Sequence, residues 1–329
     1  MILVTGGAGY IGGCFVWACK DAGLPVVVVD NLSTGRREAL PADTPLIVGD
    51  VGDQSLIEAV CREHNVTQVV HFAGSIIVDE SVRDPALYYR NNTMASLGLL
   101  EAVQRAGIEQ FVFSSTAAVY GDAEGEAVDE AAATRPVSPY GWSKLFVEQM
   151  LTDLARSSSL RFVALRYFNV AGADPHLRTG LRTQNATHLI KVCSEVAVNK
   201  REVVTVFGTD YPTVDGTGVR DYIHVADLAD AHLQALRYLA DGGNATILNC
   251  GYGRGISVRQ TIAAFDRVLG RPLPHVSGPR RAGDASQVVA DTRQILDRLD
   301  WRPRFDDIDT IIRSALEWEQ ALEAKQDGS

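Results

Sequence analysis

The chain has 329 residues, of which 46% are hydrophobic, and its formal net charge is -10 at pH 7. Such a composition can bury a large core, and it leaves intrinsic disorder only to the last residues, "AKQDGS". An acidic surface disfavours general binding to nucleic acids or anionic membranes, because both depend on basic patches. Any anionic ligand must therefore be held by local groups.

The cysteine pattern indicates a reducing compartment. The cysteines are odd in number and form no CxxC pair, which favours free thiols that pack in the interior: Cys14, Cys19, Cys61, Cys193 and Cys250. The sequence enters "MILVTGG" at once, and no apolar run is long enough to cross a bilayer. No HExxH or CxxC cluster is present, so no metal site is expected. We expect a cytoplasmic protein.

The first half of the chain alternates short β-branched runs with helical stretches. A glycine, Gly23, is placed to end the first helix, and a capping box, Ser55-x-x-Glu58, is placed to start the second. This alternation predicts right-handed crossovers and a parallel sheet covered on both faces. The expected strands are Ile2–Thr5, Val26–Asp30, Leu46–Val48, Gln68–Phe72, Gln110–Ser114 and Phe162–Tyr167, and the helices include Tyr10–Ala22, one from Asp84 to near Gly107 and one after Ser138.

After Asn169 the alternation weakens. The stretches "AGADPHLRTGLRTQN" and "GTDYPTVDGTG" are typical of loops, and long loops often carry ligands. A strand at Thr246–Asn249 and a helix capped by Ser257 predict that the chain returns to the first layer. We therefore expect one part formed by residues 1–170 plus about 225–256, and an interleaved part formed by 171–224 plus 257–329.

A glycine array marks a candidate dinucleotide site. "TGGAGYIG" places Gly6, Gly9 and Gly12 between the first strand and the first helix, where a tight turn can bring a pyrophosphate to the free amides of the helix. The second strand ends in Asp30, whose carboxylate can accept both hydroxyls of an adenine ribose and would repel a 2′-phosphate. NAD is thus favoured over NADP. The nearby Arg36–Arg37 pair is interpreted as solvated surface charge.

Two further strand ends carry residues that suit ligand binding or simple turns. "GD" at Gly49-Asp50 and "HFAG" at His71–Gly74 follow the third and fourth strands. Ligands of doubly wound sheets bind at the carboxyl ends of the strands, so both segments are expected near the cofactor.

A tyrosine and a lysine lie four residues apart in "SPYGWSK". Ser138 can cap a helix and Pro139 suits its first position, so Tyr140 and Lys144 share one helical face. A packed tyrosine and a surface lysine are the ordinary outcome of such a pair. Against this, hydroxyl residues end the preceding strand at Ser114-Ser115-Thr116. Because a tyrosine has a pKa of about 10, it needs a nearby cation to act as a base, and Lys144 can supply one. The group predicts proton removal from an alcohol during hydride transfer.

These motifs together resemble a known family. "TGGAGYIG", "HFAG", "SSTAAVYG", "SPYGWSK", "RYFNVAG" and "GTGVRDYIHVADLADAH" are similar to the extended short-chain dehydrogenase/reductases, and most of all to the UDP-glucose 4-epimerases, from Met1 to about Trp318. The resemblance implies a Rossmann-type doubly wound parallel sheet that binds NAD, with a smaller interleaved C-terminal part that binds a UDP-hexose. It also implies a homodimer built from the Asp84–Gly107 helix and the Tyr140 helix.

The resemblance also implies site residues. Tyr140 would transfer the proton, Lys144 would support it and bind the cofactor ribose, and Thr116 would be the third member. NAD would be lined by Gly6, Gly9, Tyr10, Ile11, Gly12, Asp30, Asn31, Leu32, Ser33, Thr34, Gly35, Asp50, Val51, Phe72, Ala73, Gly74, Asn91 and Phe168, besides the catalytic residues. The substrate would contact Thr116, Tyr140, Asn169, Asn185, Phe207, Arg220, Arg281 and Asp284. Arg220 and Arg281 also suit a diphosphate on chemical grounds, because arginine forms charge-assisted pairs with phosphates.

Three positions depart from the family pattern. Ile76 stands where many epimerases have a lysine, and "TQNATHLI" replaces a run similar to "NNLMPYI" around Asn185. Val288 occupies a position where a small residue is associated with N-acetylated sugars. Valine is intermediate, so we expect UDP-galactose and UDP-glucose as substrates and weak activity on N-acetylated ones.

Two other functions compete with epimerisation. A nucleotide-sugar 4,6-dehydratase shares the first oxidation but uses an Asp-Glu pair after the active-site threonine, whereas here Thr116 precedes Ala117-Ala118. A non-catalytic NAD sensor would not need Tyr140 and Lys144 together with Thr116 and both arginines. The sequence therefore favours an epimerase over both.

Overall fold

The structure, a computed structural model, describes residues 1–122, 127–183, 186–281 and 285–327. Its centre is a seven-stranded sheet whose strand pairs are all parallel. The expected doubly wound sheet is thus confirmed. Its strands are, in sheet order, β10 (Thr246–Cys250), β6 (Arg161–Tyr167), β5 (Gln110–Thr116), β4 (Gln68–His71), β1 (Ile2–Thr5), β2 (Val26–Asp30) and β3 (Leu46–Val48). The strand from the second half, β10, joins this sheet as predicted.

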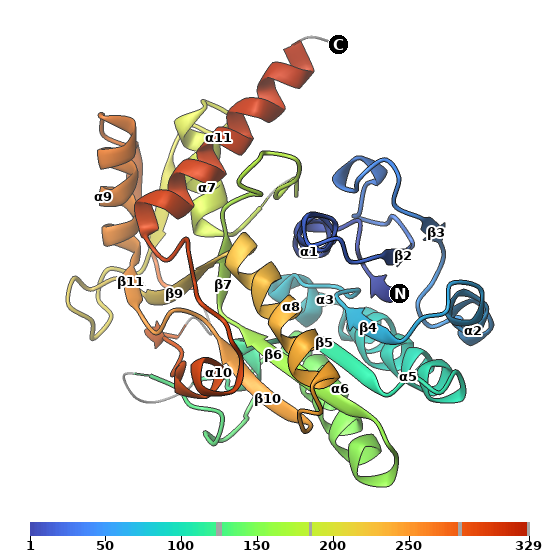
Figure 1. Ribbon diagram of the computed structural model, residues 1–329. Helices are drawn as coiled ribbons and strands as arrows, with labels where there is room; N and C mark the ends of the chain where they lie inside the picture. Colours follow the sequence, from blue (N-terminus) through green and yellow to red (C-terminus); the bar gives the residue numbers. More distant parts are fainter. Residues whose placement is uncertain (123–126, 184–185, 282–284, 328–329) are drawn as a thin grey trace.

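The sheet buries both faces because neighbouring residues of a strand point to opposite sides. Leu3, for example, packs under one helical layer, and Val4 packs under the other. One layer contains α1 (Tyr10–Asp21) and α8 (Val225–Ala240), and the other contains α2 (Gln54–Glu63), α5 (Ala95–Arg105) and α6 (Pro139–Ser157). Figure 1 shows these helices around the sheet. The long helix predicted from Asp84 is a run of α4 (Pro85–Tyr88), a π-helical segment η2 (Tyr89–Met94) and α5, preceded by α3 (Val78–Arg83).

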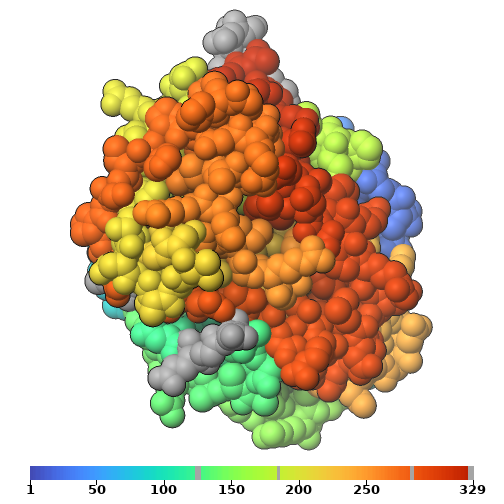
Figure 2. Space-filling model, turned by 90° about the vertical axis from the view of Figure 1, so that its left-hand side faces the viewer, coloured from blue at the N-terminus to red at the C-terminus, as the bar shows by residue number. Residues whose placement is uncertain are grey.

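The remaining elements group at the other end of the molecule (Figure 1). Two small sheets share a third hydrophobic core with α7, α9 and α11. These elements are β7 (Asn169–Ala171), α7 (Leu189–Ala197), β8 (Val204–Phe207), β9 (Val219–His224), β11 (Gly255–Ser257), α9 (Val258–Leu269), β12 (His275–Gly278), β13 (Gln287–Val288) and α11 (Ile308–Asp327). The helix α10 (Arg293–Arg298) instead lies beside β10, and its Ile295 belongs to the core that α1 and α8 share. The segments after about residue 200 cover most of the face shown in Figure 2. Within the described ranges, no helix is long and apolar enough to cross a membrane.

Helix starts follow the local capping chemistry. Ser138 accepts a bond from Gly141 N, and Ser257 forms the full capping box with Gln260, both as predicted. The prediction for α2 was wrong: Asp53, not Ser55, caps this helix by accepting a bond from Leu56 N. Asp53 stands where the extended backbone turns into the helix, so its carboxylate, and not the Ser55 hydroxyl, meets the first-turn amide.

We expect that the cap of α2 is measurable. Asp53→Ala should lower stability by about 0.5–2 kcal/mol, because it leaves a first-turn amide without its acceptor. Ser55→Ala, also at an exposed position, is the matched control and should change stability by less than about 0.5 kcal/mol. Urea unfolding followed by circular dichroism measures both, and equal losses would contradict the assignment of the cap.

Candidate active site

The glycine array forms a close turn between β1 and α1. Gly6 has φ +70°, and a Cβ there would lie 2.5 Å from the backbone nitrogen of Ala73. A Cβ on Gly12 would lie 2.3 Å from Gly6 O. Gly9 precedes the helix without any side-chain cap. The turn therefore needs glycine for space, and it leaves the first amides of α1 open to an anion such as a pyrophosphate.

Asp30 is held rigidly at the end of β2. Its two carboxylate oxygens accept bonds from Ala8 N at 2.9 Å and from Leu32 N at 2.8 Å. A Cβ on Gly35 would come within 2.9 Å of both oxygens, so this glycine keeps the approach to the carboxylate clear. The other predicted cofactor residues of this loop, Asn31, Ser33 and Thr34, are exposed beside it.

The interpretation of Arg36–Arg37 needs a correction. Arg36 is exposed, but the guanidinium of Arg37 donates to the carbonyl oxygens of Pro41, Ala42 and Thr44. Arg37 therefore folds the following loop rather than lying free in solvent, because backbone carbonyls compete for its donors.

The other predicted cofactor residues lie at the ends of β3, β4 and β6. Asp50 accepts a bond from Gly52 N at 2.7 Å, and Val51 beside it is buried. Phe72, Ala73 and Gly74 follow β4, Tyr10 and Ile11 begin α1, and Phe168 follows β6. The topology thus brings these residues to the carboxyl edge of one sheet, where β1 and β4 mark the reversal of strand order.

Two neighbouring asparagines have different environments. Asn91 is exposed and donates to Ser75 Oγ at 3.1 Å. Asn92, which the sequence analysis did not single out, is buried and bonds the backbone N–H and C=O of Ser75 and the hydroxyl of Ser143. It therefore ties the loop after β4 to the Tyr140 helix. The sequence does not indicate which of the two asparagines is buried, because the direction of each side chain depends on the π-helical turn.

The three predicted catalytic residues converge. Tyr140 and Lys144 share one side of α6, and Thr116 ends β5, where its hydroxyl acts to lower the pKa of Tyr140. Lys144 is 2% exposed, so it is no surface lysine; its Nζ donates to Ser114 O at 2.9 Å and lies 4.9 Å from the centre of the Phe113 ring. The spacing predicted from "SPYGWSK" therefore gives one polar group at the sheet edge.

Burial shapes the proton affinities of this group. Loss of water raises the pKa of Tyr140, while the bond with Thr116 lowers it. Loss of water lowers the pKa of Lys144 to about 8, and the carboxylate of Glu148 raises it. A tyrosine in this setting stays protonated near neutrality unless positive charge is added nearby. The protonated lysine provides such a charge, and a cationic cofactor ring would provide another.

Apart from Thr116 on β5 and Tyr140 on α6, the predicted substrate residues that the structure describes lie in the second group of elements. Asn169 begins β7, and Phe207 ends β8 with the guanidinium of Arg281 centred 3.9 Å from its ring. Arg220 lies in β9 directly opposite Val288 of β13. Asn185 and Asp284 lie outside the described residues.

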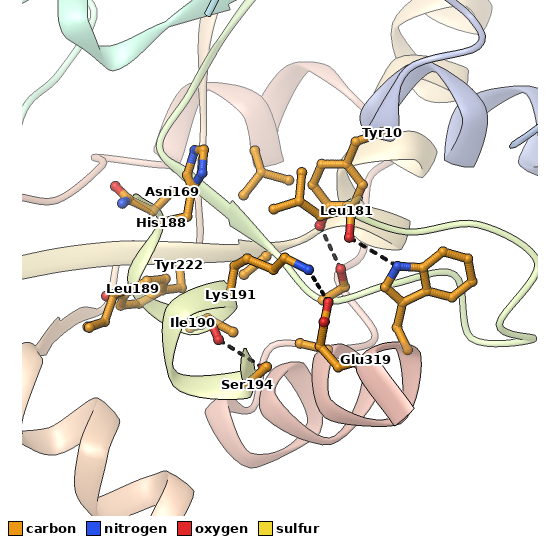
Figure 3. A pocket seen from close by; sticks show the side chains of 15 residues that line it. Tyr10, Asn169, Leu181, His188, Leu189, Ile190, Lys191, Ser194, Tyr222 and Glu319 are labelled. Atoms are coloured by element: carbon orange, nitrogen blue, oxygen red, sulfur yellow. Dashed lines mark hydrogen bonds and ion pairs between the residues drawn. The ribbon is translucent and has the colours of Figure 1, made fainter. Parts of the chain in front are cut away.

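A pocket with about 430 Å³ of empty space lies between α1, β7, α7 and α11. Figure 3 shows Tyr10 and Asn169 on its wall and the ion pair of Lys191 with Glu319 at its side. Tyr10 donates to Gly172 O at 2.7 Å. None of the three residues Thr116, Tyr140 and Lys144 lines it, so the pocket adjoins the predicted cofactor and substrate residues without containing the catalytic group.

The histidines of the site region play internal roles. His224 is fully buried, and its ring nitrogens bond Ala226 N and Ser314 Oγ. His71 bonds Thr5 and Ser96, and burial lowers its pKa to about 3. In the part of the chain that the structure describes, no group of three or more His, Cys, Asp or Glu side chains is arranged to hold a metal ion. All five cysteines are free and buried.

Comparisons with known proteins agree with this geometry. Residues 2–251 match the model of the "NAD dependent epimerase/dehydratase family". The UDP-glucose 4-epimerase of Azospirillum brasilense is 55% identical, with 98% of this chain and 92% of that protein covered. A crystal structure of UDP-glucose 4-epimerase from Stenotrophomonas maltophila with bound NAD and formylated UDP-arabinopyranose has a TM-score of 0.96 and 39% identity, covering 98% and 99% of the two chains.

A third relative has a broader name. The UDP-Glc/GlcNAc 4-epimerase from Campylobacter jejuni has a TM-score of 0.85 and 40% identity, covering 97% of this chain and 99% of the other. The sequence match, the shared fold and the geometry of the sheet edge lead to one assignment: the chain belongs to the NAD dependent epimerase/dehydratase family.

Proposed function

We propose that the protein is a UDP-glucose 4-epimerase that interconverts UDP-galactose and UDP-glucose through a transient 4-keto sugar, with NAD bound. The observation that carries the proposal is the buried Lys144, which lies one helical turn after Tyr140 and donates to Ser114 O beside Thr116, at the same sheet edge as the glycine turn. Relatives at 55% and 43% identity bear the name UDP-glucose 4-epimerase.

The residues present fit the cofactor. A side chain at Gly6 or Gly12 would fill the turn, and the carboxylate of Asp30 remains accessible beside Gly35. These groups would hold the pyrophosphate and the adenine ribose, as the sequence predicts. Bound NAD would supply reversible hydride transfer at C4 of the hexose, so epimerisation would involve no net redox change.

Three side chains would manage the proton. Tyr140 removes it from the 4-hydroxyl and later returns it, Thr116 orients the hydroxyl, and the positive charge of Lys144 favours the tyrosinate. The bond of Lys144 to Ser114 O keeps the ammonium beside the base while leaving further N–H donors for a cofactor ribose.

The substrate would be anchored through its nucleotide. Arg220 and Arg281 are suited to the diphosphate, and Phe207 offers an aromatic surface beside Arg281. Firm contacts on the nucleotide and few on the sugar allow the 4-keto hexose to turn over before the hydride returns. We assign this role to residues 171–224 plus 257–329, and the cofactor role to residues 1–170 plus about 225–256.

The dehydratase alternative lacks its acid and base. Thr116 is followed by Ala117 and Ala118 in the short helix η3 (Ala117–Val119), and alanine cannot carry a proton for the elimination of water. A sensor without catalysis could use Lys144 to bind the cofactor ribose, but it would not need Tyr140 and the Thr116 hydroxyl beside it, because binding requires no proton transfer.

The direct test is to incubate the purified protein with UDP-galactose, without added cofactor, and to separate the sugar nucleotides. We expect UDP-glucose with no accumulation of NADH. Tyr140→Phe should keep bound NAD but reduce turnover at least about 100-fold, the scale of a lost general base. A 4-keto-6-deoxy product would identify a dehydratase, and a variant as active as the native protein would remove Tyr140 from the mechanism.

We also propose that Val288 limits the size of the sugar substituent. Val288 faces Arg220 across the strand pair and packs against the cluster that contains Ala117 and Phe168. The native protein should epimerise UDP-N-acetylglucosamine weakly. Val288→Tyr should lower the kcat/KM ratio of N-acetylated to plain substrate at least about tenfold, because added bulk excludes the acetyl group.

The matched control for this prediction is Val276→Tyr, at an exposed position on β12, which should leave the ratio unchanged. Equal turnover of plain and N-acetylated substrates by the native protein would show that the preference is wrong.

We further propose that the protein forms homodimers through α6 and the helical run from Asp84 to Gly107, which contains η2 and α5. Exposed apolar side chains gather there: Met94 is 66% exposed, Leu97 43%, Trp142 38% and Phe146 42%. The ring of Phe146 contacts those of Trp142 and Tyr89, so aromatic side chains of α6 and η2 adjoin. An apolar patch on two neighbouring helices suits a four-helix bundle.

Light scattering after gel filtration tests the dimer. The native protein should elute as a dimer, and Phe146→Glu should shift it toward the monomer by burying a charge in the interface. Val276→Glu, on the far β12 strand, should leave the dimer intact. A monomeric native protein at micromolar concentration would contradict the proposal.

A further inference from the structure

A row of buried polar residues crosses the large sheet, one residue before the strand end that carries Thr116. Ser115 of β5 pairs in register with Arg166 of β6, and Arg166 pairs with Asn249 of β10. All three are at most 4% exposed. Because strand residues alternate between faces, the row lies on the side covered by α6, with Phe113 and Ala164 as its apolar neighbours two residues earlier.

Glu148 of α6 closes this row from above. Its carboxylate accepts two bonds from the Arg166 guanidinium, at 3.0 and 2.7 Å, and a short bond from the hydroxyl of Ser115. Glu148 is itself 1% exposed. The pair is thus bidentate and dry, which is the strongest geometry for an arginine and a carboxylate.

The network continues toward the substrate side. Arg166 donates to the Tyr120 hydroxyl at 2.9 Å and stacks on its ring at 4.8 Å, and Tyr120 donates to Asn249 Oδ1 at 2.7 Å. Asn249 donates to Val128 O at 2.8 Å, and Val128 forms a bridge with Ala290, two residues after Val288. Each charged or polar group in the chain of contacts is therefore paired.

The position of this network indicates a role other than stability alone. Buried ion pairs recover little of the cost of desolvation, and apolar residues of similar size often replace them without loss. Glu148, however, lies one helical turn after Lys144 and two turns after Tyr140, and Ser115 immediately precedes Thr116. The carboxylate therefore joins the two elements that carry the catalytic group.

We propose that Glu148 and Arg166 are positioning residues that fix the distance between α6 and the end of β5 and keep Lys144 protonated beside Tyr140. This inference rests on the proposed epimerase function only for the activity readout. Glu148 supplies negative charge near the ammonium, and the guanidinium of Arg166 compensates that charge through its two bonds to the carboxylate.

The Glu148 carboxylate, one helical turn further along α6, is a charged neighbour of Lys144. Burial keeps His71 neutral, and the carboxylate of Glu148 raises the pKa of Lys144 against the effect of burial. The titratable or charged groups that face Lys144 and its partner tyrosine from the surrounding elements are Tyr140 and Glu148 on α6, His71 on β4, Arg166 and Tyr167 on β6, and Tyr88 on α4. Glu148 and Arg166 are accordingly the two residues whose charges are changed in the experiment.

Opposite changes to the pair should have opposite electrostatic effects. Glu148→Gln leaves the charge of Arg166 unpaired, which favours the neutral form of Lys144. Activity that requires the ammonium is lost as pH rises through the pKa of Lys144. The alkaline limit of this variant should therefore lie at a lower pH than that of the native protein. Arg166→Gln removes the opposing cation and should leave the alkaline limit at its native position or move it to higher pH.

The experiment records kcat against pH, from 6 to 10, for the holoenzyme and these two variants. For Glu148→Gln we expect the alkaline limit to fall by on the order of one pH unit, as for a unit charge removed at close range in a protein interior. Asp153→Asn, on the exposed face of α6, is the matched control and should leave the limit unchanged. Glu148→Asp, which keeps the charge, should restore the native limit in part.

A second readout does not depend on turnover. Titration of the ¹³Cε signal of Lys144 in the holoenzyme, assigned by comparison with Lys144→Met, should show the same direction of change in the two variants. Equal downward shifts in both variants, or no shift in either, would overturn the inference and indicate a structural role alone. If the protein proves not to be an epimerase, the lysine titration still decides the question.

If either Gln variant fails to fold, two single variants, Ser115→Ala and Glu148→Asp, take its place. Ser115→Ala retains the ion pair and should keep the native alkaline limit while lowering kcat through looser placement of Thr116. An unchanged kcat for Ser115→Ala would contradict the positioning role, because that bond is the direct link between β5 and the carboxylate.

Discussion

The burial of the Lys144 ammonium is the constraint on which the rest of the site depends. An ammonium that is 2% exposed has lost most of its hydration. Contacts with the Ser114 carbonyl and the face of the Phe113 ring compensate part of the free energy of desolvation. Both partners belong to β5, so the lysine locates α6 against the strand that carries Thr116. The chemistry of the tyrosine follows from this placement, since a cation held at a defined place is worth more in a dry interior than in water.

The same sheet edge collects the groups that fit a dinucleotide. The parallel strands end at the same edge, and the pairing of the strands brings the glycine turn, Asp30 and the loop after β4 together there. Asn92 adds a lateral tie between the loop and α6. Phe207, Arg220 and Arg281 belong to the second group of elements. Under the proposed function, these residues would hold the nucleotide while the catalytic group of the large sheet acts on the sugar.

Local signals predicted many elements correctly. The caps at Ser138 and Ser257 were right because a serine before a helical pattern has few competing roles. The cap of α2 was wrong because Asp53 and Ser55 both fit a first-turn motif, and the choice depends on where the backbone turns after Asp50. Arg37 was misjudged for a related reason: its acceptors are carbonyls of a loop whose path is not visible in composition.

By itself, the sequence determined the parallel sheet, the glycine turn with Asp30, and the shared face of Tyr140 and Lys144. Each of these follows from short-range periodicity and from the geometry of a single turn or helix. Only the tertiary structure decided that Lys144 is buried, that Asn92 rather than Asn91 ties the loop to the helix, and that Ser115, Arg166 and Asn249 form one row under Glu148. Those facts depend on strand order and register, which bring together residues far apart in the chain and so leave no local trace in the sequence.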